Sequence, residues 1–186
     1  MTTVPLRGTQ SENSHDESLR FRRATGRIPS PVAIITGMDG ESRLGMTVST
    51  LTPASVTPPM VMFFASTNSK SARSIIATGA FGANVLGRSQ EGTCYQFAGS
   101  AADKFADIEI EPFPSGIPML VSCALSLDCL IESTVIVGDH VAVFGSVSWY
   151  QADPTTATSL VFYRSKLARL DSASGRHIPT ESLQWW

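Results

Sequence analysis

Short apolar runs recur along the chain with the period of β-strands. The clearest alternation follows a loop rich in Pro and Gly: every second residue from Cys123 to Ile131 is apolar, and the residues between them include Ser126 and Asp128. Further strands are expected over residues 31–36, 44–51, 60–65, 81–86, 140–149 and 160–163. Asp39-Gly40 separates the first two of these and predicts a hairpin turn.

Helices are expected over residues 69–78 and 89–98, with a shorter one over 19–25. In the helix over 69–78, Ile75 and Ile76 should face inward, and Gly79 should end the helix. Many short strands, few helices and connections too short for repeated βαβ units predict a mainly β fold, a barrel of six or seven strands with helical additions.

The two ends of the chain are polar and lack periodicity. We therefore expect a disordered arm over residues 1–18, one domain over 19–170 and a tail over 171–186. Within this tail, Trp185 and Trp186 are large apolar side chains that a partner could cover.

The composition suits one domain with a real core, because 42% of the 186 residues are apolar and 16% are charged. A net charge of −2 gives no basic field for nucleic acid, and no apolar run is long enough to span a membrane. Three cysteines without CxxC spacing and scattered histidines argue against a metal site or a disulfide framework. Reduced thiols and the lack of a signal-peptide layout predict a cytoplasmic protein. The Rossmann, Walker and nucleophile-elbow motifs are missing.

A candidate anion site lies where the strand over 60–65 meets the helix over 69–78. Residues 66–71 combine hydroxyls, a lysine and the unpaired N–H groups of a helix start. Ser, Thr and Asn are also ordinary helix caps, and this segment alone favours a cap over a ligand. However, Lys70 and Arg73 oppose the helix dipole at a cost of about 0.3–1 kcal/mol each, which a bound anion would remove. We therefore expect a phosphorylated ligand here.

Other candidate residues have two readings each. The hydroxyl run over 47–50 is either a β-prone edge strand or a wall of small side chains for a flat ring. His140, after Gly138-Asp139, either follows a plain turn or places an imidazole beside an aromatic ligand. Asp139 and His140 are not expected to pair, since neighbours on a strand point apart. Asn84 lies in an apolar strand, where burial would require polar partners.

Taken in order, these segments resemble the flavin reductase family with the FMN-binding split-barrel fold. Its members are the small reductase components of two-component flavin monooxygenases. The resemblance covers about residues 21–170 and rests on the order and spacing of the segments 30–36, 45–59, 60–71, 79–86, 97–105, 138–140 and 161–167. The chain departs from the family pattern at Gly45-Met46, where Val often follows the glycine.

The resemblance implies a homodimer of split β-barrels with a few peripheral helices and a flavin near the subunit interface. It implies that residues 46–50 line the isoalloxazine, that residues of the segment 66–71 surround the flavin phosphate, and that Asn84 and Phe105 help close the site. The implied flavin-binding residues are Met46, Thr47, Val48, Ser49, Thr50, Ser66, Thr67, Ser69, Lys70, Ser71, Asn84 and Phe105. Those implied for the nicotinamide are His140, Tyr163 and Arg164.

The implied activity is NAD(P)H:flavin oxidoreduction. A hydride passes from NAD(P)H to FAD or FMN, and the reduced flavin diffuses to a separate monooxygenase. FAD is favoured over FMN, and NADH over NADPH. No strong general base is required, because the cofactor carries the chemistry. Two alternatives stay open: a flavin-binding electron carrier without NAD(P)H turnover, and a split-barrel oxidase of a pyridoxine-like phosphate.

Overall fold

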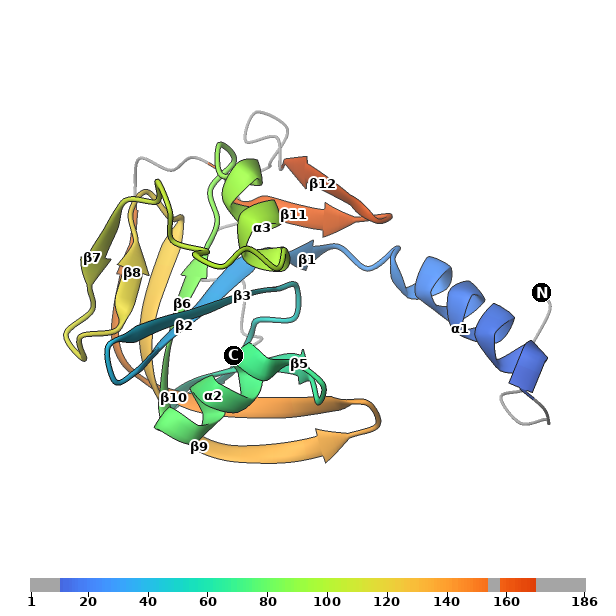
Figure 1. The fold of residues 1–186 in the computed structure, drawn as a ribbon, viewed down its shortest axis with the longest axis horizontal. Helices are drawn as coiled ribbons and strands as arrows, with labels where there is room; N and C mark the ends of the chain where they lie inside the picture. Colours follow the sequence, from blue (N-terminus) through green and yellow to red (C-terminus); the bar gives the residue numbers. More distant parts are fainter. Residues whose placement is uncertain (1–10, 154–157, 170–186) are drawn as a thin grey trace.

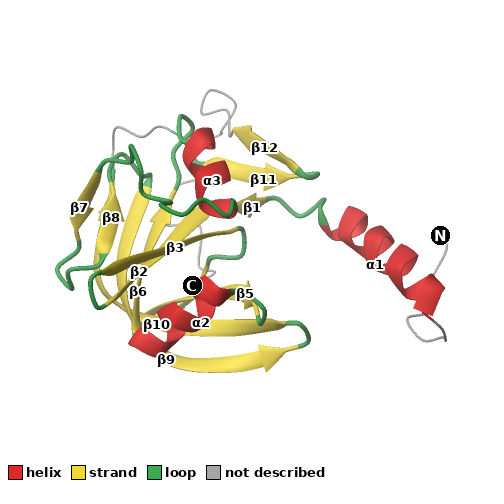
Figure 2. Cartoon of the chain, in the orientation of Figure 1, coloured by secondary structure: helices red, strands yellow, loops and turns green. Residues whose placement is uncertain are grey.

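The computed structural model describes residues 11–153 and 158–169. Strands dominate, and helices are few (Figure 1, Figure 2). In chain order the elements are α1 (Ser11–Thr25), β1 (Ser30–Pro31), β2 (Ala33–Asp39), β3 (Ser42–Val48), β4 (Thr52–Val56), β5 (Pro59–Ser66), α2 (Lys70–Thr78), β6 (Ala80–Val85), α3 (Glu91–Ala98), β7 (Ile110–Pro112), β8 (Pro118–Leu120), β9 (Leu125–Val137), β10 (His140–Ala152), β11 (Leu160–Tyr163) and β12 (Lys166–Arg169). The expected tail with Trp185 and Trp186 lies outside the described residues.

Seven strands form one antiparallel sheet in the order β3-β2-β6-β9-β10-β5-β4. Its two edges, β3 and β4, are not paired with each other, although only residues 49–51 separate them in the chain. Instead the Thr50 hydroxyl bonds to the backbone of β5, donating to the Phe64 carbonyl at 3.0 Å and accepting from the Phe64 N–H at 2.9 Å. The barrel is therefore split beside β3, and the mainly β fold with few helices is confirmed.

Two cores lie on opposite sides of β2, because successive residues of a strand point to opposite faces. Ile35 faces the main core, where Phe63 and Phe81 pack edge-to-face with ring centroids 5.1 Å apart and Ile75 enters from α2. Ile34 faces a smaller core beneath α3, which is built from Leu86, Phe97, Leu120 and Leu160. The main core anchors α2 and the smaller core anchors α3 beside β3.

Several elements lie where the sequence predicts them. The Ser69 hydroxyl caps α2 by accepting from the Ala72 N–H at 3.2 Å, Ile75 is fully buried, and Gly79 ends the helix with a φ of 78°. β2 and β3 form the expected hairpin, with Gly40 at a φ of 57° in the turn. The strand over 160–163 is β11.

Other elements correct the sequence-based expectations. The strand expected over 44–51 ends at Val48, and the separate strand β4 follows it. α1 begins at Ser11 rather than Leu19, so residues 11–18, which were expected in the disordered arm, are helical. The short strands β1, β7, β8 and β12 were not predicted, because two to four residues are too few for a recognisable period.

The polar face predicted for β9 is not solvent-exposed throughout. Asp128 is only 2% exposed, since the loop between β7 and β8 covers it. Its carboxylate accepts from the Ser115 N–H at 3.0 Å and from the Ser115 hydroxyl at 2.8 Å. The alternation predicted that Asp128 would be exposed to solvent; instead it is buried, and hydrogen bonds from Ser115 satisfy its carboxylate.

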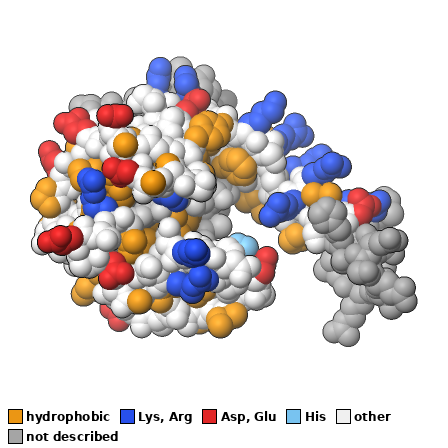
Figure 3. Space-filling model, in the orientation of Figure 1, with side chains coloured by type: hydrophobic (Ala, Val, Ile, Leu, Met, Phe, Trp, Pro, Cys, Tyr) orange, Lys and Arg blue, Asp and Glu red, His pale blue; other side chains and the backbone are white. Residues whose placement is uncertain are grey.

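α1 projects away from the barrel, and arginine side chains gather along it (Figure 1, Figure 3). Its exposed apolar residues include Phe21. No helix in residues 11–153 or 158–169 combines the length and apolar character that a membrane crossing requires.

Candidate functional site

A cavity of about 360 Å³ lies along the unpaired edge of β3; we call it the β3 cleft. One wall is β3 with the residues that follow it, the opposite wall is the end of β5 with the start of α2, and the end of α3 forms a third side. Its lining residues are Met46, Thr47, Val48, Ser49, Thr50, Phe64, Ala65, Ser66, Ser69, Ser71, Phe97, Ala98, Lys104 and His140. Most of the predicted flavin-binding residues are therefore brought together.

Two of the predicted hydroxyls serve the protein itself. Thr47 donates to the carbonyl of Cys94 at 2.8 Å and so holds β3 against α3. Thr50 bonds to the backbone of Phe64 across the split. Among the described residues the Ser49 hydroxyl has no hydrogen-bond partner, so it is available to a ligand. A ring in the cleft would meet backbone groups of the β3 edge more than threonine hydroxyls.

The start of α2 supplies unpaired donors to the same cleft. Within the described part of the chain, the N–H groups of Lys70 and Ser71 have no partner, as is usual in a first helical turn. Ser71 lines the cleft, whereas the Lys70 side chain is exposed and does not. Arg73 donates to the Thr67 carbonyl at 2.9 Å, so the conflict that the sequence suggested for this cation is partly relieved without a ligand.

His140 lines the cleft and pairs with its chain neighbour, contrary to the sequence-based expectation. The Nδ1 atom of His140 lies 2.7 Å from Oδ1 of Asp139. The two side chains meet because Asp139 belongs to the turn at Gly138, not to a regular strand. Its hydrogen bond to His140 and the nearby imidazole charge lower the pKa of Asp139. This contact orients the imidazole and leaves Nε2 for a ligand.

Thr67 holds this histidine turn against the loop before α2. Its N–H and its hydroxyl both donate to the Asp139 carbonyl at 3.0 Å. The predicted role of Thr67 at a phosphate is thus not supported by its position, since its hydroxyl is engaged and it does not line the cleft.

Lys104 is a cleft residue that the sequence reasoning missed. Its Nζ donates to the Phe97 carbonyl at 2.8 Å and to the Gly45 carbonyl at 3.3 Å. Partial burial lowers its pKa. Lys104 lies in an irregular loop, so no periodicity could have indicated it; the only signal was a lysine inside the family-like segment over 97–105.

Asn84 does not line the cleft, and the flavin role that the resemblance implied for it stays a prediction. It is fully buried. Its Nδ2 donates to the Ile34 carbonyl at 3.1 Å and to Oγ1 of Thr36 at 3.3 Å, and its Oδ1 accepts from the Leu120 N–H at 2.9 Å. These bonds link β2, β6 and β8, so Asn84 has a structural role.

Phe105, Tyr163 and Arg164 do not line the cleft. Phe105 is buried and packs edge-to-face on Phe97, a cleft residue, with ring centroids 4.9 Å apart. Tyr163 and Arg164 are at the turn between β11 and β12, where the Arg164 N–H bonds to the Gly26 carbonyl.

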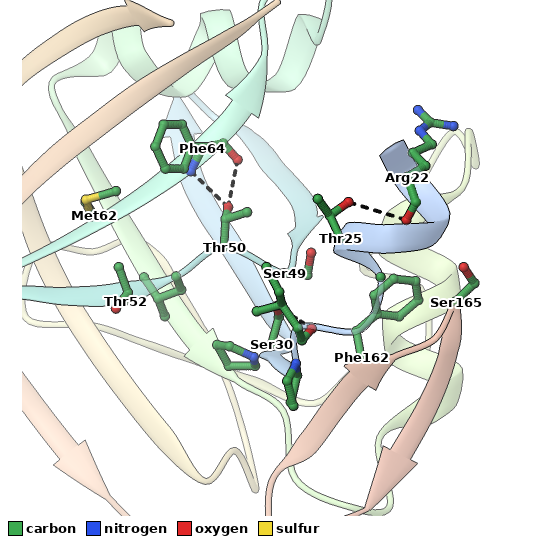
Figure 4. A pocket seen from close by; sticks show the side chains of 15 residues that line it. Arg22, Thr25, Ser30, Ser49, Thr50, Thr52, Met62, Phe64, Phe162 and Ser165 are labelled. Atoms are coloured by element: carbon green, nitrogen blue, oxygen red, sulfur yellow. Dashed lines mark hydrogen bonds between the residues drawn. The ribbon is translucent and has the colours of Figure 1, made fainter. Parts of the chain in front are cut away.

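A larger cavity of about 760 Å³ adjoins the cleft (Figure 4); we call it the α1 cavity. It shares Ser49, Thr50 and Phe64 with the cleft. Its other sides come from the end of α1, from residues 28–31 and from the β11–β12 hairpin, which contributes Phe162 and Ser165. Two ligands, one in each cavity, would therefore meet at Ser49 and Thr50.

The site contains neither a metal cluster nor a disulfide. No three His, Cys, Asp or Glu side chains within residues 11–153 and 158–169 are placed to hold a metal ion. Cys94, Cys123 and Cys129 are all free and buried. Burial raises the pKa of both Cys123 and Cys129 to about 12, so neither is a ready nucleophile.

A family model described as "Flavin reductase like domain" matches residues 25–171. The chain belongs to this flavin reductase family. The match includes every cleft and α1-cavity residue from Thr25 onward.

Curated relatives agree with this assignment. The reductase subunit HsaB of a flavin-dependent monooxygenase from Rhodococcus jostii is 34% identical over 152 residues, which are 82% of this chain and 77% of the relative. A flavin reductase from Pseudomonas putida is 34% identical over 145 residues, 77% of this chain and 85% of the relative. An NADH-dependent flavin reductase from a Rhodococcus species is 32% identical over 158 residues, 82% of this chain and 86% of that protein.

Solved structures have the same fold. A nitrilotriacetate monooxygenase component B homologue from Mycobacterium thermoresistibile superposes with a TM-score of 0.86 at 28% identity, covering 89% of this chain and 93% of that one. The flavin reductase of styrene monooxygenase from Pseudomonas putida S12 superposes with a TM-score of 0.73 at 27% identity, covering 81% and 97%. The split barrel is therefore the family fold.

Proposed function

We propose that this flavin reductase is an NAD(P)H:flavin oxidoreductase that supplies reduced flavin to a separate monooxygenase. The observation that carries the proposal is the junction of two cavities at Ser49 and Thr50 in a chain of this family. Hydride transfer requires two rings in contact, and two adjoining cavities provide for that. Relatives named as reductase subunits of monooxygenases support the separate partner.

The residues of the β3 cleft fit a flavin. The cleft offers a strand edge with unpaired backbone groups, free N–H donors at the start of α2, the hydroxyls of Ser49 and Ser71, and the Lys104 ammonium group. Donors of this kind suit a phosphate at the helix start and the polar edge of a ring along β3. When bound, the flavin accepts a hydride. The protein binds and orients the rings and keeps water from them.

Asp139 fixes the imidazole of His140 in the β3 cleft, and we propose that His140 meets the nicotinamide where the nicotinamide stacks against the flavin held there. Tyr163 and Arg164 lie between Phe162 and Ser165, which line the α1 cavity, so they border the proposed nicotinamide site. Arg22, at the end of α1, borders the same cavity (Figure 4).

We further propose NADH as the preferred reductant and FAD as the preferred flavin. Relatives named NADH-dependent flavin reductase and NADH:riboflavin 5′-phosphate oxidoreductase support NADH as the reductant. Riboflavin 5′-phosphate is FMN, so FMN is the alternative flavin to test. The test is a steady-state assay that crosses NADH and NADPH with FAD and FMN and follows nicotinamide absorbance. A protein that holds flavin through purification but oxidises neither nicotinamide would instead be a flavin carrier.

Replacing His140 with alanine should leave the flavin Kd nearly unchanged and reduce kcat/KM for NADH on the order of tenfold or more. The loss follows from one hydrogen bond and one ring contact that position the nicotinamide, each worth about 1–2 kcal/mol. The measurements are flavin fluorescence titration and NADH kinetics on the same preparation.

Asp139→Asn is the matched variant, because it keeps the turn and removes only the charge beside His140. We expect a smaller loss with the same pattern. A collapse of flavin binding in His140→Ala, with normal hydride transfer in the remaining complex, would assign His140 to the flavin instead.

A homodimer is proposed from two exposed apolar surfaces, one beside the α1 cavity and one at the tip of the β9–β10 hairpin. Phe21 and Ile28 are 63% and 64% exposed beside the cavity, and Val135, Ile136 and Val137 are exposed at the hairpin tip. Such surfaces need cover, and a second copy is the commonest source. The cleft and the α1 cavity are both open, so a second subunit would also supply the wall that two stacked ligands need.

Light scattering at micromolar concentration should give about twice the 19.9 kDa mass of the chain. Ile136→Asp should shift the mass toward the monomer and weaken turnover with it, since it places a charge on the apolar tip. Glu132→Gln, on the same strand, is the control and should stay dimeric. A monomer of 19.9 kDa with full reductase activity would contradict the dimer.

A further inference from the structure

Lys104 is a cation in the β3 cleft without an acidic partner. No ion pair in the described part of the chain includes it. The neighbouring Asp103 is directed elsewhere: one oxygen lies 3.8 Å from Arg43, and the other accepts from the Phe105 N–H at 2.8 Å. The ammonium group of Lys104 has three donors, and two backbone carbonyls take two of them. One donor and the full positive charge remain for a ligand.

Lys104 and the start of α2 both line the cleft. Lys104 binds the carbonyl of Gly45, and the next residue, Met46, places its sulfur 3.9 Å from the hydroxyl of Ser69, the cap of α2. One ligand in the cleft can therefore contact both the start of α2, at Ser71, and the Lys104 ammonium group. Lys70, the cation that the sequence suggested, is exposed outside the lining of the cleft.

We propose that Lys104, rather than Lys70, supplies the cation for the flavin phosphate. The inference rests on the proposed flavin reductase function and assigns the charge recognition within its site. Phosphate would take the third Lys104 donor together with the N–H and hydroxyl of Ser71. An ammonium group paired with phosphate at a helix start is a favourable combination of point charge and backbone donors.

A purely structural role for Lys104 makes different predictions. Its bond to Phe97 lies at the C-terminal end of α3, where any cation stabilises a helix. In that case, removing the charge should lower the melting temperature and weaken all flavins alike. A phosphate role should instead discriminate FMN, which has the phosphate, from riboflavin, which lacks it.

The experiment compares Lys104→Gln with the matched variant Lys70→Gln in the full chain. Fluorescence titration gives the Kd values for FMN and riboflavin, and thermal unfolding gives the stability. Glutamine keeps a donor for the two carbonyls while removing the charge. We expect Lys104→Gln to raise the FMN Kd on the order of tenfold or more and to change the riboflavin Kd by less than about threefold. Lys70→Gln should change both by less than about threefold, and Lys104→Arg should restore part of the FMN affinity.

Equal losses for FMN and riboflavin, or a selective loss in Lys70→Gln, would overturn the proposal. So would a wild-type protein that binds FMN no more tightly than riboflavin. If Lys104→Gln unfolds, Lys104→Met removes the charge in its place, and Lys104→Arg remains the variant that keeps it. Wild-type NADH oxidation is measured in parallel: selective FMN loss without turnover would keep the Lys104 assignment and reject the reductase function.

Discussion

Replacing Asn84 with alanine is expected to lower the free energy of unfolding by about 2–5 kcal/mol while leaving flavin affinity unchanged in the folded protein. The change leaves the Leu120 N–H and the Ile34 carbonyl without their present partners in a fully buried place. Each such group costs about 1–3 kcal/mol, and Thr36 loses a bond as well. Urea unfolding followed by circular dichroism measures the loss.

Gln151→Ala is the control for Asn84→Ala, because Gln151 is exposed on β10 and should change stability by less than about 0.5 kcal/mol. Flavin titration of the folded Asn84 variant separates the structural role from the implied binding role. If the Asn84→Ala protein has normal stability but lower flavin affinity, Asn84 contributes to flavin binding and the structural interpretation is wrong.

Replacing Gly45 with valine is expected to disturb the part of the cleft that Phe97 and Lys104 line. A Cβ atom at Gly45 would lie 2.4 and 2.6 Å from two ring atoms of Phe97, so the ring and α3 must move. Overpacking of this kind costs about 1–3 kcal/mol of stability. Both carbonyls that hold Lys104 belong to these two residues, so the lysine loses its position. We expect the FMN Kd to rise on the order of tenfold or more, beyond what the stability loss explains.

The matched control for Gly45→Val is Gly92→Ala in α3. A Cβ at Gly92 meets no atom within 4 Å, and alanine favours a helix over glycine by about 1 kcal/mol. This variant should be slightly more stable with normal FMN affinity. Phe97→Leu combined with Gly45→Ala should relieve the clash and restore part of the binding. Unchanged FMN binding in Gly45→Val would show that FMN binding does not depend on the position of Phe97, which would contradict this prediction.

Local rules predicted the parts of the site that depend on local geometry. The cap at Ser69 and the stop at Gly79 follow from helix chemistry, and both were confirmed. The resemblance then placed residues 46–50 and the start of α2 in one site, and the cleft brings them together. The individual binding roles stay predictions.

What the sequence missed depends on contacts distant in the chain or on turns. Asn84 reaches Leu120, 36 residues further along, so its role is invisible to periodicity. Asp139 and His140 were treated as strand neighbours, but a positive φ at Gly138 turns the backbone and lets the side chains meet. Lys104 is in a loop that only tertiary packing directs to the carbonyls of Gly45 and Phe97.

The unpaired edge of β3 affects the tendency of the protein to self-associate between catalytic cycles. The opposite edge strand, β4, carries Pro53 and a register shift beside it, which are devices that block pairing with another chain. No register shift interrupts β3 where it pairs with β2, and no proline lies within it, so apart from the Gly45 carbonyl, which accepts from Lys104, its outer edge can pair with another strand. A flavin bound along this edge would block strand addition, and release of the flavin would expose the edge again. A reductase that gives its flavin away would then be most prone to self-association when it has just released its product.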